Sequence, residues 1–147
     1  MGADLYIKKL PREVQYKHCG FSTEAVKDGY FRDCYNSGGL FAVMSANLGR
    51  TFSWWQLVGR KDFGFNKNGE LPAKNVKKFR NELVRDVEVF SRKKVLYYAE
   101  WDLQTGKDKR GKKVSADEVK EYQEWANGLL LFLDVAIENK SSIIFSV

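Results

Sequence analysis

Apolar and polar residues follow two different periods along the chain, and together these periods predict helices framed by a strand at each end. The segments 3–7 (ADLYI) and 142–147 (SIIFSV) are short runs rich in β-prone residues and predict strands. Between them, apolar residues recur three or four positions apart, which is the spacing of one face of a helix. The helices predicted from this spacing and from the residues at their ends cover 22–29, 37–49, 53–59, 72–103 and 115–138.

The ends of these helices carry residues that favour starting or stopping a helix. Serine or threonine is expected to cap the N-terminal ends, and glycine is expected to end three of the helices. The predicted caps are Ser22 or Thr23, Ser37, Ser53 and Ser115, and the predicted stops are Gly29, Gly49 and Gly59. Pro72 suits the first helical position of the fourth helix, and Glu118 completes a capping box with Ser115.

The segment 93–103 fits both a helix and a strand. Tyr97 and Trp101 extend the apolar face of the preceding helix, which favours a helix as far as about Leu103. The run 95–98 (VLYY) is also typical of a strand. The next residues, 104–114, are charged and contain glycine, so we expect a basic loop there.

The length of 147 residues and the hydrophobic content of 44% are enough for one packed domain. There are only two prolines and no Ser/Pro-rich stretch, so no linker divides the chain and we expect a single domain over 1–147. The predicted fold class is α+β and mostly helical. It has four to five helices and a small sheet that pairs the N- and C-terminal strands.

The positive charge of the chain is concentrated in its middle. The net charge is +6, with +3 in residues 1–60, +7 in residues 61–113 and −4 in residues 114–147. One possibility is that the acidic last helix packs beside the basic segment and neutralises part of it. The second is that the basic segment meets an anionic partner such as nucleic acid or an acidic protein surface.

Residue types that mark a compartment or a metal site are scarce. Cys19 and Cys34 are too few for a disulfide framework, so we expect two reduced thiols in a cytoplasmic protein. The longest apolar run, 129–133, is too short to span a membrane, and no membrane partner is expected. His18 is the only histidine, so a Cys/His metal site lacks ligands. We expect no metal and no cofactor.

The sequence contains partial matches to motifs of known chemistry, but none of these motifs is complete. Residues 106–112 match the spacing of a phosphate-binding loop, but Lys113 stands where Mg²⁺ coordination needs a serine or threonine. No nucleophile motif has its partners, and the paired carboxylates of 117–124 fall on a helix face that we expect to be solvated. We therefore expect a protein that is not an enzyme.

The segment 29–39 (GYFRDCYNSGG) combines three rings, an Arg-Asp pair and glycines. The favoured interpretation is structural, because the segment joins two predicted helices and its glycines allow a close corner. The alternative is a ligand pocket, since rings and charges together are also typical of binding sites. The residues expected to line such a pocket are Tyr30, Arg32, Asp33 and Tyr35.

Basic residues interleaved with aromatic ones give the second candidate site. Trp54 and Trp55 are adjacent, so both cannot face the core of one helix, and one of them could act as a stacking surface. The cations expected to accompany it are Lys74, Lys78, Arg85, Lys109, Arg110, Lys112 and Lys113. The favoured interpretation is that most of these aromatic residues belong to the core, because aromatic side chains are usually buried.

Four segments resemble a family of small proteins from bacteriophages and prophages: MGADLYI at the N-terminus, GYFRDCYN at 29–36, SWW at 53–55 and the ending 129–147. The resemblance covers both termini and the region 29–58, and it is weaker over 61–113. The family has no assigned activity. The resemblance implies a small intracellular protein made by a mobile genetic element.

The function expected from these observations is inhibition by binding. The leading hypothesis is a non-enzymatic, anti-CRISPR-like counter-defence protein that binds a host defence protein or nucleoprotein in the host cytoplasm. The alternative is direct binding of nucleic acid or a nucleotide by the basic segment 74–113 and an exposed tryptophan. A small enzyme is the third and weakest hypothesis. The oligomeric state stays open.

Overall fold

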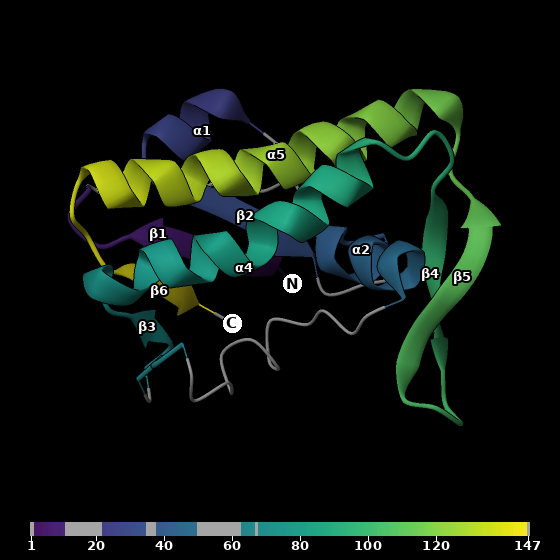
Figure 1. Cartoon of the computed structure of the whole chain (residues 1–147), viewed down its shortest axis with the longest axis horizontal. Helices are drawn as coiled ribbons and strands as arrows, with labels where there is room; N and C mark the ends of the chain where they lie inside the picture. Colours follow the sequence, from purple (N-terminus) through teal and green to yellow (C-terminus); the bar gives the residue numbers. More distant parts are fainter. Residues whose placement is uncertain (1, 11–21, 35–37, 50–62, 67, 147) are drawn as a thin grey trace.

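A four-stranded antiparallel sheet brings the two ends of the chain together (Figure 1). The structure is a computed structural model that describes residues 2–10, 22–34, 38–49, 63–66 and 68–146. The strands of this sheet are, in order, β2 (Tyr30–Cys34), β1 (Gly2–Ile7), β6 (Ile143–Ser146) and β3 (Glu70–Leu71). The prediction that the terminal strands pair is therefore confirmed.

The helices in the described part of the chain are α1 (Thr23–Lys27), α2 (Leu40–Leu48), α4 (Ala73–Ser91) and α5 (Ala116–Glu138). With the small sheet they make an α+β fold that is mostly helical, as the sequence predicts. The predicted helix 53–59, with its cap Ser53 and stop Gly59, lies outside the described residues.

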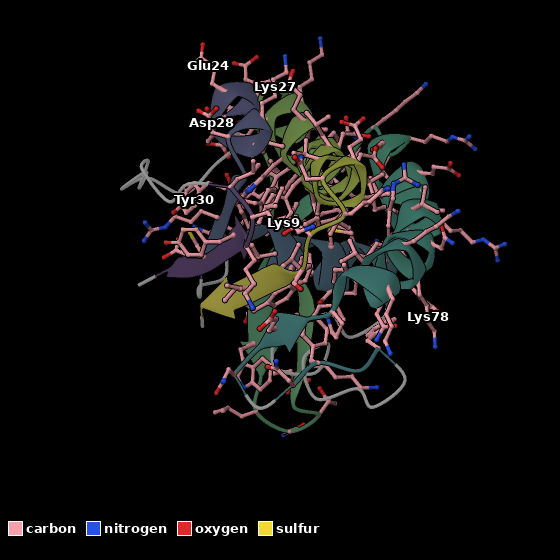
Figure 2. The ribbon with its side chains drawn as sticks, turned by 90° about the vertical axis from the view of Figure 1, so that its left-hand side faces the viewer. Lys9, Glu24, Lys27, Asp28, Tyr30 and Lys78 are labelled. Carbon is pink, nitrogen blue, oxygen red and sulfur yellow. The ribbon has the colours of Figure 1, made fainter. Side chains whose placement is uncertain are left out.

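The core lies between one face of the sheet and the long helices. Leu5 is the register partner of both Phe31 and Phe145, so these three buried side chains line one face of the sheet. Helix α5 is seen nearly end-on in Figure 2, between α1 and α4. Its apolar stripe contacts that of α4, and burying the two stripes together is the main source of stability for such helices.

Two segments near the C-terminal end of α4 differ from the prediction. The helix ends at Ser91, so the expected continuation to Leu103 is wrong. Residues Tyr97–Asp102 form strand β4, and Lys107–Lys113 form strand β5 where a basic loop was expected. The two strands pair with each other in a separate two-stranded sheet. Local periodicity missed this pairing because the charged sequence of β5 gives no strand signal of its own.

The predicted helix ends at Ser22, Ser115 and Gly49 are confirmed. Pro72 differs from the prediction, because it is the N-cap residue of α4 and precedes the first helical residue. Ser22 Oγ accepts from Ala25 N at 3.3 Å, and Ser115 Oγ accepts from Glu118 N at 3.4 Å. Gly49 ends α2 with a φ of 65°, in the left-handed region that favours glycine. The start of α2 differs from the prediction, because its N-cap residue is Gly39 and not Ser37, which lies outside the described residues.

The buried carboxylate of Asp33 satisfies the start of α2 in place of a serine cap. Its Oδ1 accepts from Cys34 N and from Leu40 N, each at 2.7 Å, and its Oδ2 accepts from Phe41 N at 3.2 Å. The first N–H groups of a helix lack partners within the helix, and a carboxylate placed there also complements the helix dipole. Asp33 therefore ties the end of β2 to the beginning of α2.

Helix α5 holds the same corner from the other side. Trp125 Nε1 donates to Arg32 O at 3.0 Å, and the Tyr122 hydroxyl donates to Gly38 O at 2.7 Å. Burial, followed by the nearby carboxylates, raises the pKa of Tyr122 to about 12, so its hydroxyl remains a donor at neutral pH. The segment 29–39 thus contributes structural contacts to two other elements.

One expectation about the cysteines is wrong. Cys34 is disulfide-bonded, whereas the sequence predicted reduced thiols. The other cysteine of the chain, Cys19, lies outside the described residues. Composition could not anticipate a bond that depends on which segments the fold brings together. Disulfides are uncommon in the cytosol, so the cysteines no longer support the predicted compartment.

None of the helices among the described residues has the length and apolar character needed to cross a membrane.

The role of Asp33 predicts a large loss of stability when its charge is removed. Asp33→Asn keeps the size of the side chain but replaces a double acceptor by an amide, one side of which is a donor. We expect the free energy of unfolding to fall by about 3 kcal/mol, because hydrogen bonds between a buried carboxylate and backbone N–H groups are lost. Urea denaturation measures this change.

The matched control is Asp28→Asn, which makes the same substitution at an exposed position. We expect it to change the free energy of unfolding by less than about 0.5 kcal/mol. Equal effects of the two substitutions would contradict the role of Asp33.

Candidate binding surfaces

Strands β4 and β5 form a hairpin at the end of the molecule next to α2, and its tip extends away from the helices (Figure 1). The turn is closed by Gly106 N, which donates to Asp102 O at 2.8 Å. Asp102 Oδ1 also accepts from Gln104 N at 2.9 Å, and Gly106 has a φ of 66°. These hydrogen bonds give the tip a defined shape without help from the core.

The buried side chain of Asn47 fixes the hairpin to α2. Its Nδ2 donates to Tyr97 O at 2.8 Å, and its Oδ1 accepts from Tyr97 N at 3.0 Å. The same Nδ2 donates to Val43 O at 2.7 Å, within α2. The amide therefore pairs with the first residue of β4 as a neighbouring strand would.

Contacts with α5 hold the base of the hairpin. The Tyr98 hydroxyl donates to Glu118, and the Tyr98 ring meets the Tyr122 ring edge-on with centroids 6.3 Å apart. Val114 N donates to Leu96 O at 2.8 Å, which extends the ladder beyond the ends of the two strands. The hairpin is thus fixed at its base and exposed at its tip.

The exposed part of the hairpin combines apolar and cationic side chains. Trp101 is 56% exposed and Leu103 is 89% exposed, and both lie at or next to the tip. The guanidinium carbon of Arg110 lies 5.2 Å from the centre of the Tyr97 ring, on the face that Trp101 shares. We call Trp101, Leu103 and Arg110 the hairpin surface.

A second basic surface runs along α4. At about 100° per residue, a single sector of this helix about 80° wide holds positions 74, 78, 81, 85, 89 and 92. We call this sector the α4 ridge; it comprises Lys74, Lys78, Asn81, Arg85, Val89 and Arg92, and all six are exposed. The buried residues of α4, such as Phe79 and Leu83, lie on the opposite side.

The predicted basic residues are thus divided between two places. Lys74, Lys78 and Arg85 lie on α4, whereas Lys109, Arg110, Lys112 and Lys113 lie on β5. Lys113 and Lys94 line a cavity of about 380 Å³ at the start of α5, at the base of the hairpin. Tyr35, Trp54 and Trp55 lie outside the described residues.

The acidic helix α5 packs beside the basic helix α4. This arrangement is the one expected if α5 neutralises part of the basic segment. The ion pair recorded between them joins Arg80 Nε to Asp134 Oδ1 at 2.5 Å. Arg80 lies on the flank of α4 and not on the ridge. This ion pair with α5 therefore lies on the side of α4 and not on the ridge.

The remaining predicted residues lie on the outer face of the sheet or in its corner. The Tyr30 hydroxyl donates to Asp4 Oδ1 at 2.5 Å, and Arg32 Nε lies 3.7 Å from the same oxygen. Burial, together with Asp4, raises the pKa of Tyr30. Asp33 points to the other side, where it caps α2, so Tyr30, Arg32 and Asp33 do not form one cluster.

The described residues contain no group of three or more His, Cys, Asp or Glu side chains arranged to hold a metal ion. Comparisons with models of protein families, with curated proteins and with solved structures gave no match to this chain.

The sequence interpretation missed Trp101, Leu103 and Asn47. It assigned Trp101 to the core because a helix was expected there. The β-prone run 95–98 and the Thr-Gly pair at 105–106 indicate a strand followed by a turn, but the charged run 107–113 gives no strand signal of its own. Asn47 gives no local signal, since its partner is the backbone of a distant strand.

Asp108 predicts a pH dependence of hairpin stability. Burial raises the pKa of this carboxyl, which lies opposite Trp101. An acid whose pKa is raised on folding stabilises the fold when protonated, and this contribution is lost as the pH rises through the folded-state pKa. Ionised Asp108 is therefore unfavourable to the fold at neutral pH.

We expect Asp108→Asn to raise the melting temperature at pH 7, and we expect this gain to disappear at pH 3, below the usual pKa of aspartate. Thermal denaturation of both proteins from pH 3 to pH 8 measures it. A difference that is the same at every pH would contradict the assignment.

Proposed function

We propose that this chain is a non-enzymatic binding protein that inhibits a host defence system, with the hairpin surface as its contact with a defence protein. The observation that carries this proposal is the exposure of Trp101 and Leu103 on a hairpin whose base is fixed. Large apolar side chains at the surface of a small protein mark interaction sites more often than chance.

The composition of the hairpin surface supports a protein partner. Tryptophan and arginine are the residues most enriched among those that dominate the affinity of protein interfaces. The strand register places Arg110 on the same face of the hairpin as Trp101. Lys107 and Lys109 lie on the other face, where Lys109 Nζ is 3.7 Å from Glu100 Oε1. The guanidinium group of Arg110 favours a partner with an acidic surface.

The way the hairpin is held also favours binding. Asn47 and Tyr98 fix its first two residues to α2 and α5. A surface that is already ordered loses less conformational entropy when it binds, so more of the contact energy appears as affinity.

The resemblance to bacteriophage and prophage proteins supports counter-defence as the purpose of this binding. Proteins of mobile elements that act without chemistry commonly work by occupying a surface of a host protein, and the anti-CRISPR proteins are an example. The proposed place of action, the host cytoplasm, rests on this resemblance alone.

The test is affinity purification of the tagged protein from host cells, with Trp101→Ala/Leu103→Ala compared with the wild type. We expect the wild type to capture a component of a defence system, and the double variant to retain at most about a tenth of it. Loss of anchor residues of this kind commonly costs more than 1 kcal/mol each.

The matched control is Val89→Ala, which truncates an exposed apolar side chain on α4. It should capture as much as the wild type. Undiminished capture by the double variant, or capture of no defence component by the wild type, would contradict the proposal.

A further inference from the structure

The α4 ridge is chemically different from the hairpin surface. Among the exposed charged residues of 73–92 there are five cations, Lys74, Lys77, Lys78, Arg85 and Arg92, and two carboxylates, Glu82 and Glu88. The carboxylates lie at the two edges of the ridge and not on its centre line. Val89 is the one apolar side chain among the six positions of the ridge.

The ridge is long. From Lys74 to Arg92 it spans about 27 Å at 1.5 Å per residue. Figure 2 shows Lys78 projecting from α4 on the side of the molecule away from α1, where Glu24, Lys27 and Asp28 lie. This surface is therefore separate from the acidic side chains of α1 and, by its position on α4, from the tip of the hairpin.

The first turn of α4 carries a positive charge, which lowers the stability of the helix. Its first turn contains Lys74 and no carboxylate, whereas the first turn of α5 contains Asp117 and Glu118. A cation near the N-terminus of a helix interacts unfavourably with the helix dipole. The positive charge of this end is thus not explained by the needs of the fold.

We infer that the α4 ridge binds the phosphate backbone of double-stranded DNA. A row of cations on a convex helix matches the charge of a duplex, which carries one phosphate for about every 1.7 Å of its axis. An α-helix also fits the major groove, which is about 12 Å wide.

The ridge residues favour a duplex over a single strand. Proteins that hold single strands stack the bases on aromatic side chains, and the ridge has none. They also favour nucleic acid over an acidic protein, because the centre of a protein interface is usually built from apolar anchors. This inference concerns a different surface from the hairpin and does not rest on the proposed function.

The test is fluorescence anisotropy with a labelled DNA duplex of about 20 base pairs, which exceeds the roughly 8 base pairs that the ridge can span. We expect binding at low salt that weakens as salt rises. With about four phosphates neutralised, the slope of log K against log salt should be about −3.6.

Lys78→Gln/Arg85→Gln should weaken binding at least tenfold and make that slope shallower by about 2. The control is Lys27→Gln/Lys120→Gln, which removes the same charge from exposed positions on α1 and α5 and should leave the slope unchanged. Equal effects of the two double variants, or the absence of duplex binding at low salt, would overturn the inference.

Two further variants distinguish binding by the ridge from a loss of stability and from binding by the hairpin. Lys74→Glu should weaken DNA binding and raise the melting temperature, because the new carboxylate suits the start of the helix; binding lost together with stability would contradict a role in binding. Trp101→Ala/Leu103→Ala should bind the duplex as the wild type does.

Loss of duplex binding in that hairpin variant would overturn the assignment to α4. A single-stranded oligonucleotide of the same sequence, or poly-glutamate, that binds as tightly as the duplex would overturn the choice of ligand. Host-protein capture by Lys78→Gln/Arg85→Gln should stay at the wild-type level, so the failure of either proposal can be distinguished from the failure of the other.

Discussion

The three hydrogen bonds that the Asp33 carboxylate accepts from backbone N–H groups set the direction in which α2 leaves the sheet. The position of the hairpin formed by β4 and β5 depends on this direction. Helix α2 carries Asn47 in its last turn, and Asn47 holds the backbone of Tyr97. A carboxylate near the end of β2 therefore fixes the position of a hairpin that begins more than sixty residues later in the chain.

The two surfaces that we assign to binding are supported differently. The hairpin surface depends on this succession of contacts and on Tyr98, so it is sensitive to changes in the corner. The α4 ridge depends only on a long amphipathic helix that packs its apolar stripe against α5.

The parts of the fold that could be predicted from the sequence are those specified locally. The apolar stripe of α4, the capping box of Ser115 and the two terminal strands each carry their signal within a few residues. The hairpin could not be predicted in this way, because Lys107–Lys113 becomes a strand only when it pairs with β4. The roles of Asp33 and Asn47 could not be predicted locally either, since the groups they bind come from other elements. The sequence identified the basic residues as candidates for binding. Their division between α4 and β5 could not be predicted, because it depends on where α4 ends.

The central claim, that the Asp33 corner positions the hairpin through α2 and Asn47, can be tested by amide hydrogen exchange in Asp33→Asn under conditions where the protein remains folded. We expect exchange to accelerate at Leu40 and Phe41, which lose their acceptor, and also at Tyr97, whose N–H donates to Asn47. Amides in the middle of α4 and α5 should keep their protection. Acceleration at Leu40 and Phe41 with no change at Tyr97 would contradict the claim.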